Sequence, residues 1–356
     1  MRCGAGISPD VTGGPPVSAL AYCLVPSPEH TLEGHAEHPE RFSHLEQAVA
    51  SLPADAVRRI EPQPADEESL LAVHPERYLR ALEAACKQGP AYVDYAPTYV
   101  TPHSITAASL AAGGTLKVLD EMLAGRARTA LALVRPPGHH ATATRAMGFC
   151  LLNNAAVAAR AAQRAGHRRI LIIDVDLHHG NGTQAIFESD PEVLYVSTHQ
   201  AGIYPGSGAL EETGIEQGVG ATVNIPLYPH CGDETFARLT DQILVPLARR
   251  FVPDMLFISA GFDSHWRDPL GQLQLTCAGY SRLASTLGAL ADELCGGRVL
   301  VVLEGGYDAE ALAAGVLSVA CALAGLPARP DPLGAGGYLE PDMSPLLERV
   351  RQTHGL

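Results

Sequence analysis

Residues 169–182 read RILIIDVDLHHGNG, and this stretch decides the fold prediction. Its first half, Arg169–Val175, is almost continuously apolar and runs into a cluster of Asp and His followed by glycine. Such runs, bounded by polar turns, are typical of strands buried on both faces, as in a parallel sheet. The chain repeats the pattern in five other runs: Ala19–Val25, Thr129–Val134, Val193–Thr198, Asp254–Ala260 and Arg298–Leu303.

Longer amphipathic stretches separate the apolar runs and are predicted to be helices. They are His44–Leu52, Glu76–Lys87, Ile105–Leu123, Asn154–Ala165, Glu234–Phe251, Ala278–Leu294 and Ala309–Ala324. This alternation indicates βαβ units and an α/β fold, a single domain with an open, mostly parallel sheet and helices on both faces. We assign it to residues 18–327, after a flexible N-terminal arm (1–17) and before an irregular C-terminal strap (328–356) packed on the domain.

Composition restricts the function classes. Of the 356 residues, 46% are hydrophobic and 18% charged, which supports a sizeable core and excludes a disordered chain. The formal net charge of −14 argues against direct binding to nucleic acid or to anionic membranes. The apolar, uncharged stretch Ala311–Leu326 is shorter than the ~18 residues of a membrane span. Eight scattered cysteines without a C-x-x-C pair favour reduced thiols, and hence a cytoplasmic protein.

Polar side chains follow four of the predicted strands, where open α/β sheets bind their ligands. They are His139 and His140, then Asp174, Asp176, His178 and Asn181, then Asp263, and finally Tyr307. There is no G-x-G-x-x-G after a strand, no Walker loop and no G-x-S-x-G, so nucleotide-dependent and serine-hydrolase chemistry have little support.

Asp176, His178 and Asp263 form a candidate set of metal ligands. Residues two apart in an extended segment point the same way, so Asp176 and His178 can meet one ion, and Asp263 arrives from another strand end. Three protein ligands with an open position suit catalytic zinc, while two carboxylates and one imidazole leave Fe(II), Co(II) or Mn(II) open. The alternative is that D-x-D-x-H only caps a turn.

The two adjacent histidines are a weak signal alone, but facing a metal one imidazole could take a proton from water and give it to a leaving amine. Asp174 and Asn181 are the candidates to orient them. Tyr307 could donate to a developing oxyanion, or it could be a packed loop tyrosine. Phe149, after Gly148, and Tyr204 could line a slot for an aliphatic chain, although such aromatic residues often only pack.

Six ordered motifs, with HPER (38–41) before them, make this chain resemble the zinc-dependent histone deacetylase family. They are RPPGHHA (135–141), GFCLLNNAAVAA (148–159), DVDLHHGNGTQAIF (174–187), STHQAGIYPGSG (197–208), SAGFDSHWRDPLG (259–271) and LEGGYD (303–308). The resemblance implies the arginase/deacetylase fold. Asn181 stands where class I relatives carry aspartate, so the chain looks like class II and the bacterial histone deacetylase-like amidohydrolases.

Carried over by position, the resemblance implies one zinc ion on Asp176, His178 and Asp263. It makes His140 the general base and acid with Asn181 as partner, and His139 a second imidazole paired with Asp174. Tyr307 would polarise the acyl carbonyl, and Gly148, Phe149 and Tyr204 would border the acyl-lysine channel. The family also tends to bind K⁺ or Na⁺, here matched by Asp174, Asp176, His178, Ser197 and Thr198.

The expected reaction is hydrolysis of acyl-lysine in proteins or peptides by metal-activated water. One alternative is a deacetylase of acetylpolyamines or other small amides, and a distant one is a non-catalytic acyl-lysine binder. The spacing of Asp263 and Asp268 also leaves open a further alternative, a dinuclear, arginase-like ureohydrolase. Asp94, Tyr99, His265 and Trp266 are candidates for the rim or ordinary loop residues. An oligomer is compatible with the sequence.

Overall fold

The computed structural model describes residues 18–95 and 97–356, so the predicted arm (1–17) lies outside the described residues. Eight strands form one sheet in the order β2-β1-β5-β10-β9-β6-β7-β8, and every neighbouring pair is parallel. The strands are β1 (Ser18–Val25), β2 (Val57–Arg59), β5 (Ala127–Val134), β6 (Ile170–Asp174), β7 (Val193–Gln200), β8 (Thr222–Leu227), β9 (Met255–Ala260) and β10 (Val299–Leu303). The predicted α/β fold with a parallel sheet is therefore confirmed.

All six apolar runs are strands of this sheet, and the sequence analysis missed only its two edges. β2 has three residues, and β8 contains Asn224 and Pro226 within TVNIPL. Edge strands need not be apolar on both sides or donate every backbone N–H, so neither carries the pattern of a central strand. A separate antiparallel pair, β3 (Ala91–Tyr92) and β4 (Tyr99–Val100), was also not predicted.

Alternate side chains of each central strand enter two different hydrophobic cores. In β1, Leu20 and Tyr22 belong to one core, while Ala21 and Cys23 belong to the other. Successive strand residues point to opposite faces of a sheet, and here both faces are covered. A strand buried on both sides must be apolar throughout, which explains why continuous apolar runs predicted it.

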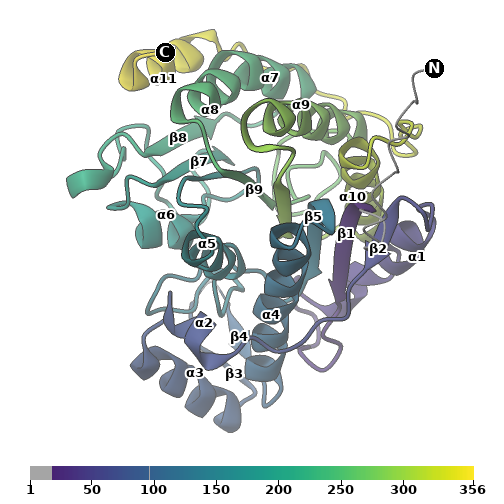
Figure 1. The fold of residues 1–356 in the computed structure, drawn as a ribbon, viewed down its shortest axis with the longest axis vertical. Helices are drawn as coiled ribbons and strands as arrows, with labels where there is room; N and C mark the ends of the chain where they lie inside the picture. Colours follow the sequence, from purple (N-terminus) through teal and green to yellow (C-terminus); the bar gives the residue numbers. More distant parts are fainter. Residues whose placement is uncertain (1–17, 96) are drawn as a thin grey trace, which may run out of the picture.

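Helices cover both faces (Figure 1), with α4 and α5 on one side of the strands and α9 and α10 on the other. The first face carries α2 (Glu67–Leu71), α3 (Glu76–Gln88), α4 (Ser104–Leu123), α5 (Asn154–Arg164) and α6 (Asn181–Phe187). The second carries α1 (Leu45–Ala50), α7 (Asp233–Leu239), α8 (Val245–Phe251), α9 (Cys277–Cys295), α10 (Ala309–Leu323) and α11 (Ser344–His354). A π-helical turn (Thr240–Leu244) joins α7 to α8, and short 3₁₀ helices occupy Pro39–Phe42 and Glu216–Gly218.

The C-terminal segment corrects one prediction. Residues 328–356 were expected to be irregular, but Ser344–His354 forms α11, whose Leu347 and Val350 are buried in the second core. The preceding stretch is irregular and packed as expected: the Glu340 carboxylate accepts the backbone N–H groups of Glu234 and Thr235 at the start of α7. Proline and glycine before residue 343 obscured an amphipathic pattern only three turns long.

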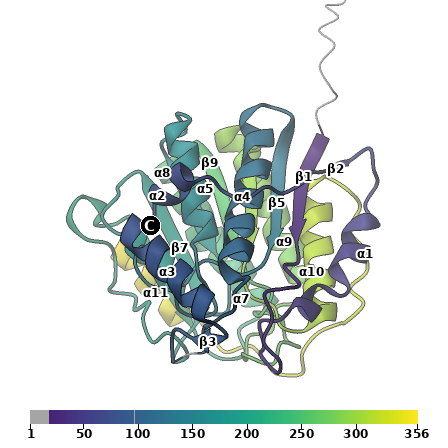
Figure 2. The same cartoon turned by 90° about the horizontal axis from the view of Figure 1, so that it is seen from below.

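In Figure 2 the strands run downward, and the loops after their carboxyl ends gather at the lower edge, where β3 lies. The site described next is built at this edge. None of the helices in residues 18–95 and 97–356 combines the length and apolarity needed to cross a membrane. Seven cysteines within these residues are free thiols, and all seven are buried.

Candidate active site

Three side chains from two neighbouring strands meet at the carboxyl edge of the sheet. Asp176 and His178 follow β6, and Asp263 follows β9, the strand paired with β6. One ligand atom from each lies within 4.8 Å of the other two. His178 Nδ1 is 3.2 Å from Asp176 Oδ1 and 3.2 Å from Asp263 Oδ2, and each carboxylate residue is 1% exposed. The structure therefore brings together the three residues predicted as metal ligands.

The chemistry of this cluster fits a divalent cation. Asp263 Oδ2 is buried and makes no hydrogen bond of acceptable geometry with a described residue. Burial first, and the charge of Asp176 second, raise the pKa of Asp263 to about 6. Burial alone would lower the pKa of His178, but the neighbouring Asp176 and Asp263 carboxylates raise it to about 10. Two buried carboxylates thus draw a positive charge into the site, and a metal ion would supply it.

Two glycines leave room for the ligand carboxylates. A Cβ atom at Gly261 would lie 2.1 Å from Asp176 Oδ2, and one at Gly305 would lie 2.2 Å from Asp263 Oδ2. Any side chain at either position would displace a carboxylate, so the cluster requires close approach of the bare backbone. Gly305 also donates its N–H to Asp176 Oδ2 at 2.9 Å, which fixes that oxygen.

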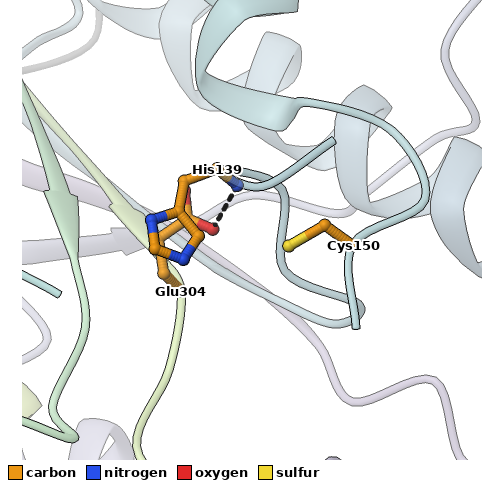
Figure 3. Close-up of side chains that lie close together, drawn as sticks. All are labelled: His139, Cys150 and Glu304. Atoms are coloured by element: carbon orange, nitrogen blue, oxygen red, sulfur yellow. Dashed lines mark hydrogen bonds between the residues drawn. The ribbon is translucent and has the colours of Figure 1, made fainter. Parts of the chain in front are cut away.

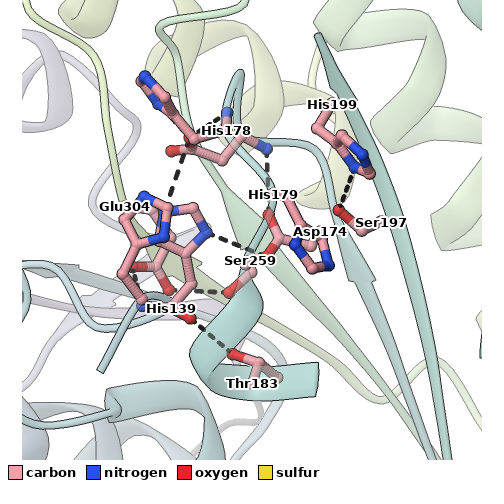
Figure 4. Close-up of polar contacts among 12 residues, drawn as sticks. His139, Asp174, His178, His179, Thr183, Ser197, His199, Ser259 and Glu304 are labelled. Carbon is pink, nitrogen blue, oxygen red and sulfur yellow. Dashed lines mark hydrogen bonds and ion pairs between the residues drawn. The ribbon is translucent and has the colours of Figure 1, made fainter. Parts of the chain in front are cut away.

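The histidine pair follows β5 and packs beside the cluster, with ring centroids 4.0 Å apart. His139 Nδ1 lies 3.1 Å from Asp174 Oδ2 (Figure 4), and His140 Nδ1 lies 2.8 Å from Asn181 Oδ1. The two imidazoles therefore have different partners, one charged and one neutral. These are the pairings that the sequence motifs implied, and the roles of the residues stay predictions.

Their partners separate the two histidines electrostatically. Burial, followed by the neighbouring His139 and His178, holds the pKa of His140 well below its usual value. Burial opposes ionisation of His139 as well, but the Asp176 and Asp174 carboxylates raise its pKa well above the usual value. These surroundings favour the cationic form of His139 and the neutral form of His140, and such differences between neighbouring groups are typical of active sites.

Tyr307, after β10, completes this face of the site. Its ring lies under the Arg41 guanidinium, 4.6 Å from ring centroid to Cζ, and meets Phe149 edge to face at 5.9 Å. Tyr204 packs edge to face on His140 at 5.1 Å, and its hydroxyl donates to Asp94 Oδ2 at 3.4 Å. The two aromatic residues predicted for the channel, Phe149 and Tyr204, thus contact Tyr307 and His140, and the channel itself stays a prediction.

Beside Tyr307 an open cavity of about 720 Å³ is walled by residues 31–36, 38–40 and 269. Two candidate rim residues do not reach it. Tyr99 is 2% exposed and donates its hydroxyl to the His30 and Glu37 carbonyls, and His265 is 1% exposed. Both are packed inside the protein, Tyr99 in β4, so of the two interpretations left open for them the structure favours ordinary packing over the rim.

The residues predicted for a monovalent cation share Asp176 and His178 with the divalent cluster and add Asp174, Ser197 and Thr198 from β6 and β7. Thr198 Oγ1 donates to the Asp174 carbonyl at 3.3 Å, and Ser197 Oγ is 2.9 Å from His199 Nδ1. The Asp174 carboxylate accepts from the Tyr195 hydroxyl and the Asp176 backbone N–H. The K⁺ or Na⁺ site stays a prediction.

Sequence analysis missed Glu304, a fully buried carboxylate directly after β10. Its Oε2 accepts the backbone N–H groups of Gly138 and His139 at 2.7 and 3.0 Å, and Figure 3 shows the second of these bonds. Its Oε1 accepts from the Ser259 hydroxyl at 2.8 Å (Figure 4). Burial raises the pKa of Glu304 to about 7. An acidic residue at the end of an apolar run was the available signal. Its backbone partners lie 166 and 165 positions away and Ser259 lies 45 positions away, so none of these contacts was visible in the sequence.

His139, Cys150 and Glu304 also lie within 4.8 Å of one another, but their chemistry does not fit a second metal. The Glu304 oxygens already accept three hydrogen bonds, and His139 Nδ1 faces Asp174. Burial raises the pKa of the Cys150 thiol well above its usual value, which disfavours the thiolate that metals bind.

We expect Glu304→Ala to lower the free energy of unfolding by about 1–3 kcal/mol, because two buried N–H groups would lose their acceptor. Glu304→Gln keeps one acceptor oxygen for these N–H groups and can direct its amide N–H towards Ser259, so its cost should be smaller. Urea titration of both variants measures the difference. Equal stability of Glu304→Ala and wild type would show that the hydrogen bonds accepted by Glu304 contribute nothing to the free energy of unfolding.

Comparison with known proteins identifies relatives over most of the chain. A family model described as "Histone deacetylase domain" matches residues 35–323. A "Probable deacetylase" of Archaeoglobus fulgidus is 41% identical over 295 residues, covering 81% of this chain and 82% of the relative. A "Histone deacetylase-like amidohydrolase" of Pseudomonas aeruginosa is 40% identical, covering 77% and 73%. The solved structure titled "Crystal Structure of HDA15 HD domain" superposes with a TM-score of 0.85 at 36% identity, covering 95% and 94%.

Proposed function

Because the chain belongs to the histone deacetylase family, we propose that it is a metal-dependent amidohydrolase that removes acetyl or other acyl groups from acyl-lysine in proteins or peptides. One observation carries the proposal: the three candidate metal ligands, the histidine pair and Tyr307 meet at one edge of the sheet. We propose Zn²⁺ as the resident ion, held by Asp176, His178 and Asp263, although this donor set also suits Fe(II) or Co(II).

When bound, the cation would polarise the acyl carbonyl and lower the pKa of water towards ~7. The proton transfers fall to His140. Its Nδ1 faces the Asn181 amide oxygen at 2.8 Å and therefore donates, which leaves Nε2 free to accept a proton from the attacking water. As the bond between acyl carbon and nitrogen breaks, the same Nε2 returns the proton to the departing amine.

His139 and Tyr307 are proposed to stabilise the negative charge that develops during the reaction, Tyr307 directly at the acyl oxygen. His139 is held as a cation by Asp174 and Asp176, and it adds positive charge beside His140. Burial raises the pKa of Tyr307 well above its usual value, so its hydroxyl stays protonated at neutral pH and can donate to an oxyanion. Retention of each reactive group supports a catalyst over a non-catalytic acyl-lysine binder.

Gly148, Phe149 and Tyr204 are the proposed walls of the channel for the acyl-lysine chain. The open cavity of about 720 Å³ beside Tyr307 provides space for the peptide flanking the lysine, and this supports acyl-lysine peptides over acetylated polyamines as substrates. The arginase-like alternative loses support because Asp268 is absent from the ligand cluster and engages backbone N–H groups instead. The scattered, buried thiols support a cytoplasmic location.

The substrate proposal predicts higher kcat/KM for an Nε-acetyl-lysine peptide than for N-acetylputrescine. The assay uses protein stripped of metal and reloaded with one Zn²⁺ per chain. Higher kcat/KM for acetylputrescine would favour the small-amide alternative. Binding of the peptide without turnover of either compound, at full zinc loading, would contradict the hydrolase proposal itself.

A further inference from the structure

Asp268 is a buried carboxylate that the proposed mechanism does not use. It lies five positions after Asp263, in the loop that follows β9, and is 5% exposed. Oδ1 accepts the backbone N–H of Leu270 at 3.0 Å, and Oδ2 accepts the backbone N–H of Tyr307 at 2.6 Å. Within the described residues it forms no ion pair. Burying a carboxylate without a cationic partner costs free energy of folding, so the two hydrogen bonds that Asp268 accepts point to a role for this side chain.

The segment before Tyr307 has no side chains of its own to fix its position. It consists of Gly305 and Gly306, which have no side chains to pack, and Gly306 has a φ of +122°. Gly305 is fixed by hydrogen bonds to Asp176 and Phe262, and the Gly306 carbonyl accepts from Arg41 Nε at 2.6 Å. The backbone of Tyr307 itself is tied through the Asp268 carboxylate.

The phenol end of Tyr307 has no anchor of its own. Its oxygen makes no hydrogen bond with any residue in the described part of the chain, and the cation–π and ring–ring contacts of its ring are those with Arg41 and Phe149. The direction of the Cα–Cβ bond therefore decides where the hydroxyl points. That direction depends on the backbone atoms that Asp268 holds.

We propose that Asp268 is a positioning residue, which aims the Tyr307 hydroxyl at the reacting carbonyl by fixing the Tyr307 backbone N–H. The inference rests on the proposed function, because it assigns Asp268 a part in the same reaction. A carboxylate suits this position because it offers an acceptor oxygen to each of two N–H groups from separate loops. An amide offers one acceptor oxygen, and alanine offers none.

The kinetic test combines Asp268→Ala and Asp268→Asn with Tyr307→Phe. Asp268→Ala should lower kcat by about 10–100-fold with little change in KM, since only a transition-state contact is misplaced. Asp268→Asn keeps one bond and should fall between alanine and wild type. In the Tyr307→Phe background, Asp268→Ala should cause no further loss, because residues that act through one another are not additive.

Asp308→Ala is the matched control. This carboxylate also accepts a backbone N–H, from Ala311, and stands next to Tyr307 without touching its N–H. We expect kcat close to wild type in this variant, even if its melting temperature falls. Metal content is measured in every variant. Loss of metal from Asp268→Ala, or an equal loss of kcat in the wild-type and Tyr307→Phe backgrounds, would overturn the proposal.

A second measurement does not depend on turnover. With 3-fluorotyrosine at all 11 tyrosines, the ¹⁹F resonance that is missing in Tyr307→Phe belongs to Tyr307. In Asp268→Ala, or in Asp268→Asn if alanine fails to fold, that resonance should shift or broaden while distant ones stay unchanged. An unchanged Tyr307 resonance would refute the positioning role. A protein inert towards acyl-lysine would instead refute the proposed function and leave this readout valid.

Discussion

Replacing His140 with alanine is expected to lower kcat by about 10²–10⁴-fold, the usual contribution of a general acid–base group. His140 is the neutral imidazole of the pair, oriented by Asn181, and its ring lies edge to face with that of His178, with centroids 5.8 Å apart. His139 cannot replace it, because the Asp174 and Asp176 carboxylates keep His139 protonated. Steady-state hydrolysis of an acetyl-lysine peptide by the zinc-loaded variant measures the loss.

The pH dependence gives a second view of the same residue. The folded protein holds the pKa of His140 well below its usual value, so the imidazole stays neutral, and able to accept a proton, below pH ~6.5. The acidic limb of the kcat/KM profile should therefore fall below that pH. His103→Ala removes an exposed histidine and serves as the control. Full turnover in His140→Ala would show that another group carries the proton.

Removal of the metal ligand Asp263 should abolish both metal binding and activity. In Asp263→Asn the metal content of purified protein should fall from about one ion per chain to near zero, and kcat should drop by at least about 10³-fold. The apo variant should remain folded, because the substitution removes a buried negative charge that lies beside Asp176. Elemental analysis, circular dichroism and peptide turnover measure these three outcomes.

Metal exchange provides the matched experiment on the wild-type chain. A chelator should abolish turnover, and one equivalent of Zn²⁺, Fe(II) or Co(II) should restore it to different extents, which identifies the most effective ion. Asp331→Asn is the control for the Asp263 substitution, and it should keep both its metal and its turnover. The Asp331 carboxylate accepts the backbone N–H groups of Leu333 and Gly334 and is not among the candidate metal ligands. Turnover that survives complete removal of metal would contradict the proposed mechanism.

Much of the fold was readable because the central strands are buried on both faces. This requirement makes the sequences of β1, β5, β6, β7, β9 and β10 apolar throughout, and all six were predicted within a few residues. β2 escaped detection because it has only three residues, and β8 because Asn224 and Pro226 interrupt its apolar run. α11 escaped because only one face of it is buried. Tertiary pairing, not propensity, makes three residues such as Val57–Arg59 a strand.

The candidate site residues themselves could be predicted from the sequence alone. Asp176, His178, the histidine pair and Tyr307 stand directly after apolar runs, and a parallel sheet brings the carboxyl ends of its strands to one edge. What only the tertiary structure decided is the support around them. Glu304 meets Gly138, and Asp268 meets Tyr307, across separations of 166 and 39 positions. Strand order in the sheet, set by the packing of helices on both faces, determines those contacts, and no local pattern in the chain encodes them.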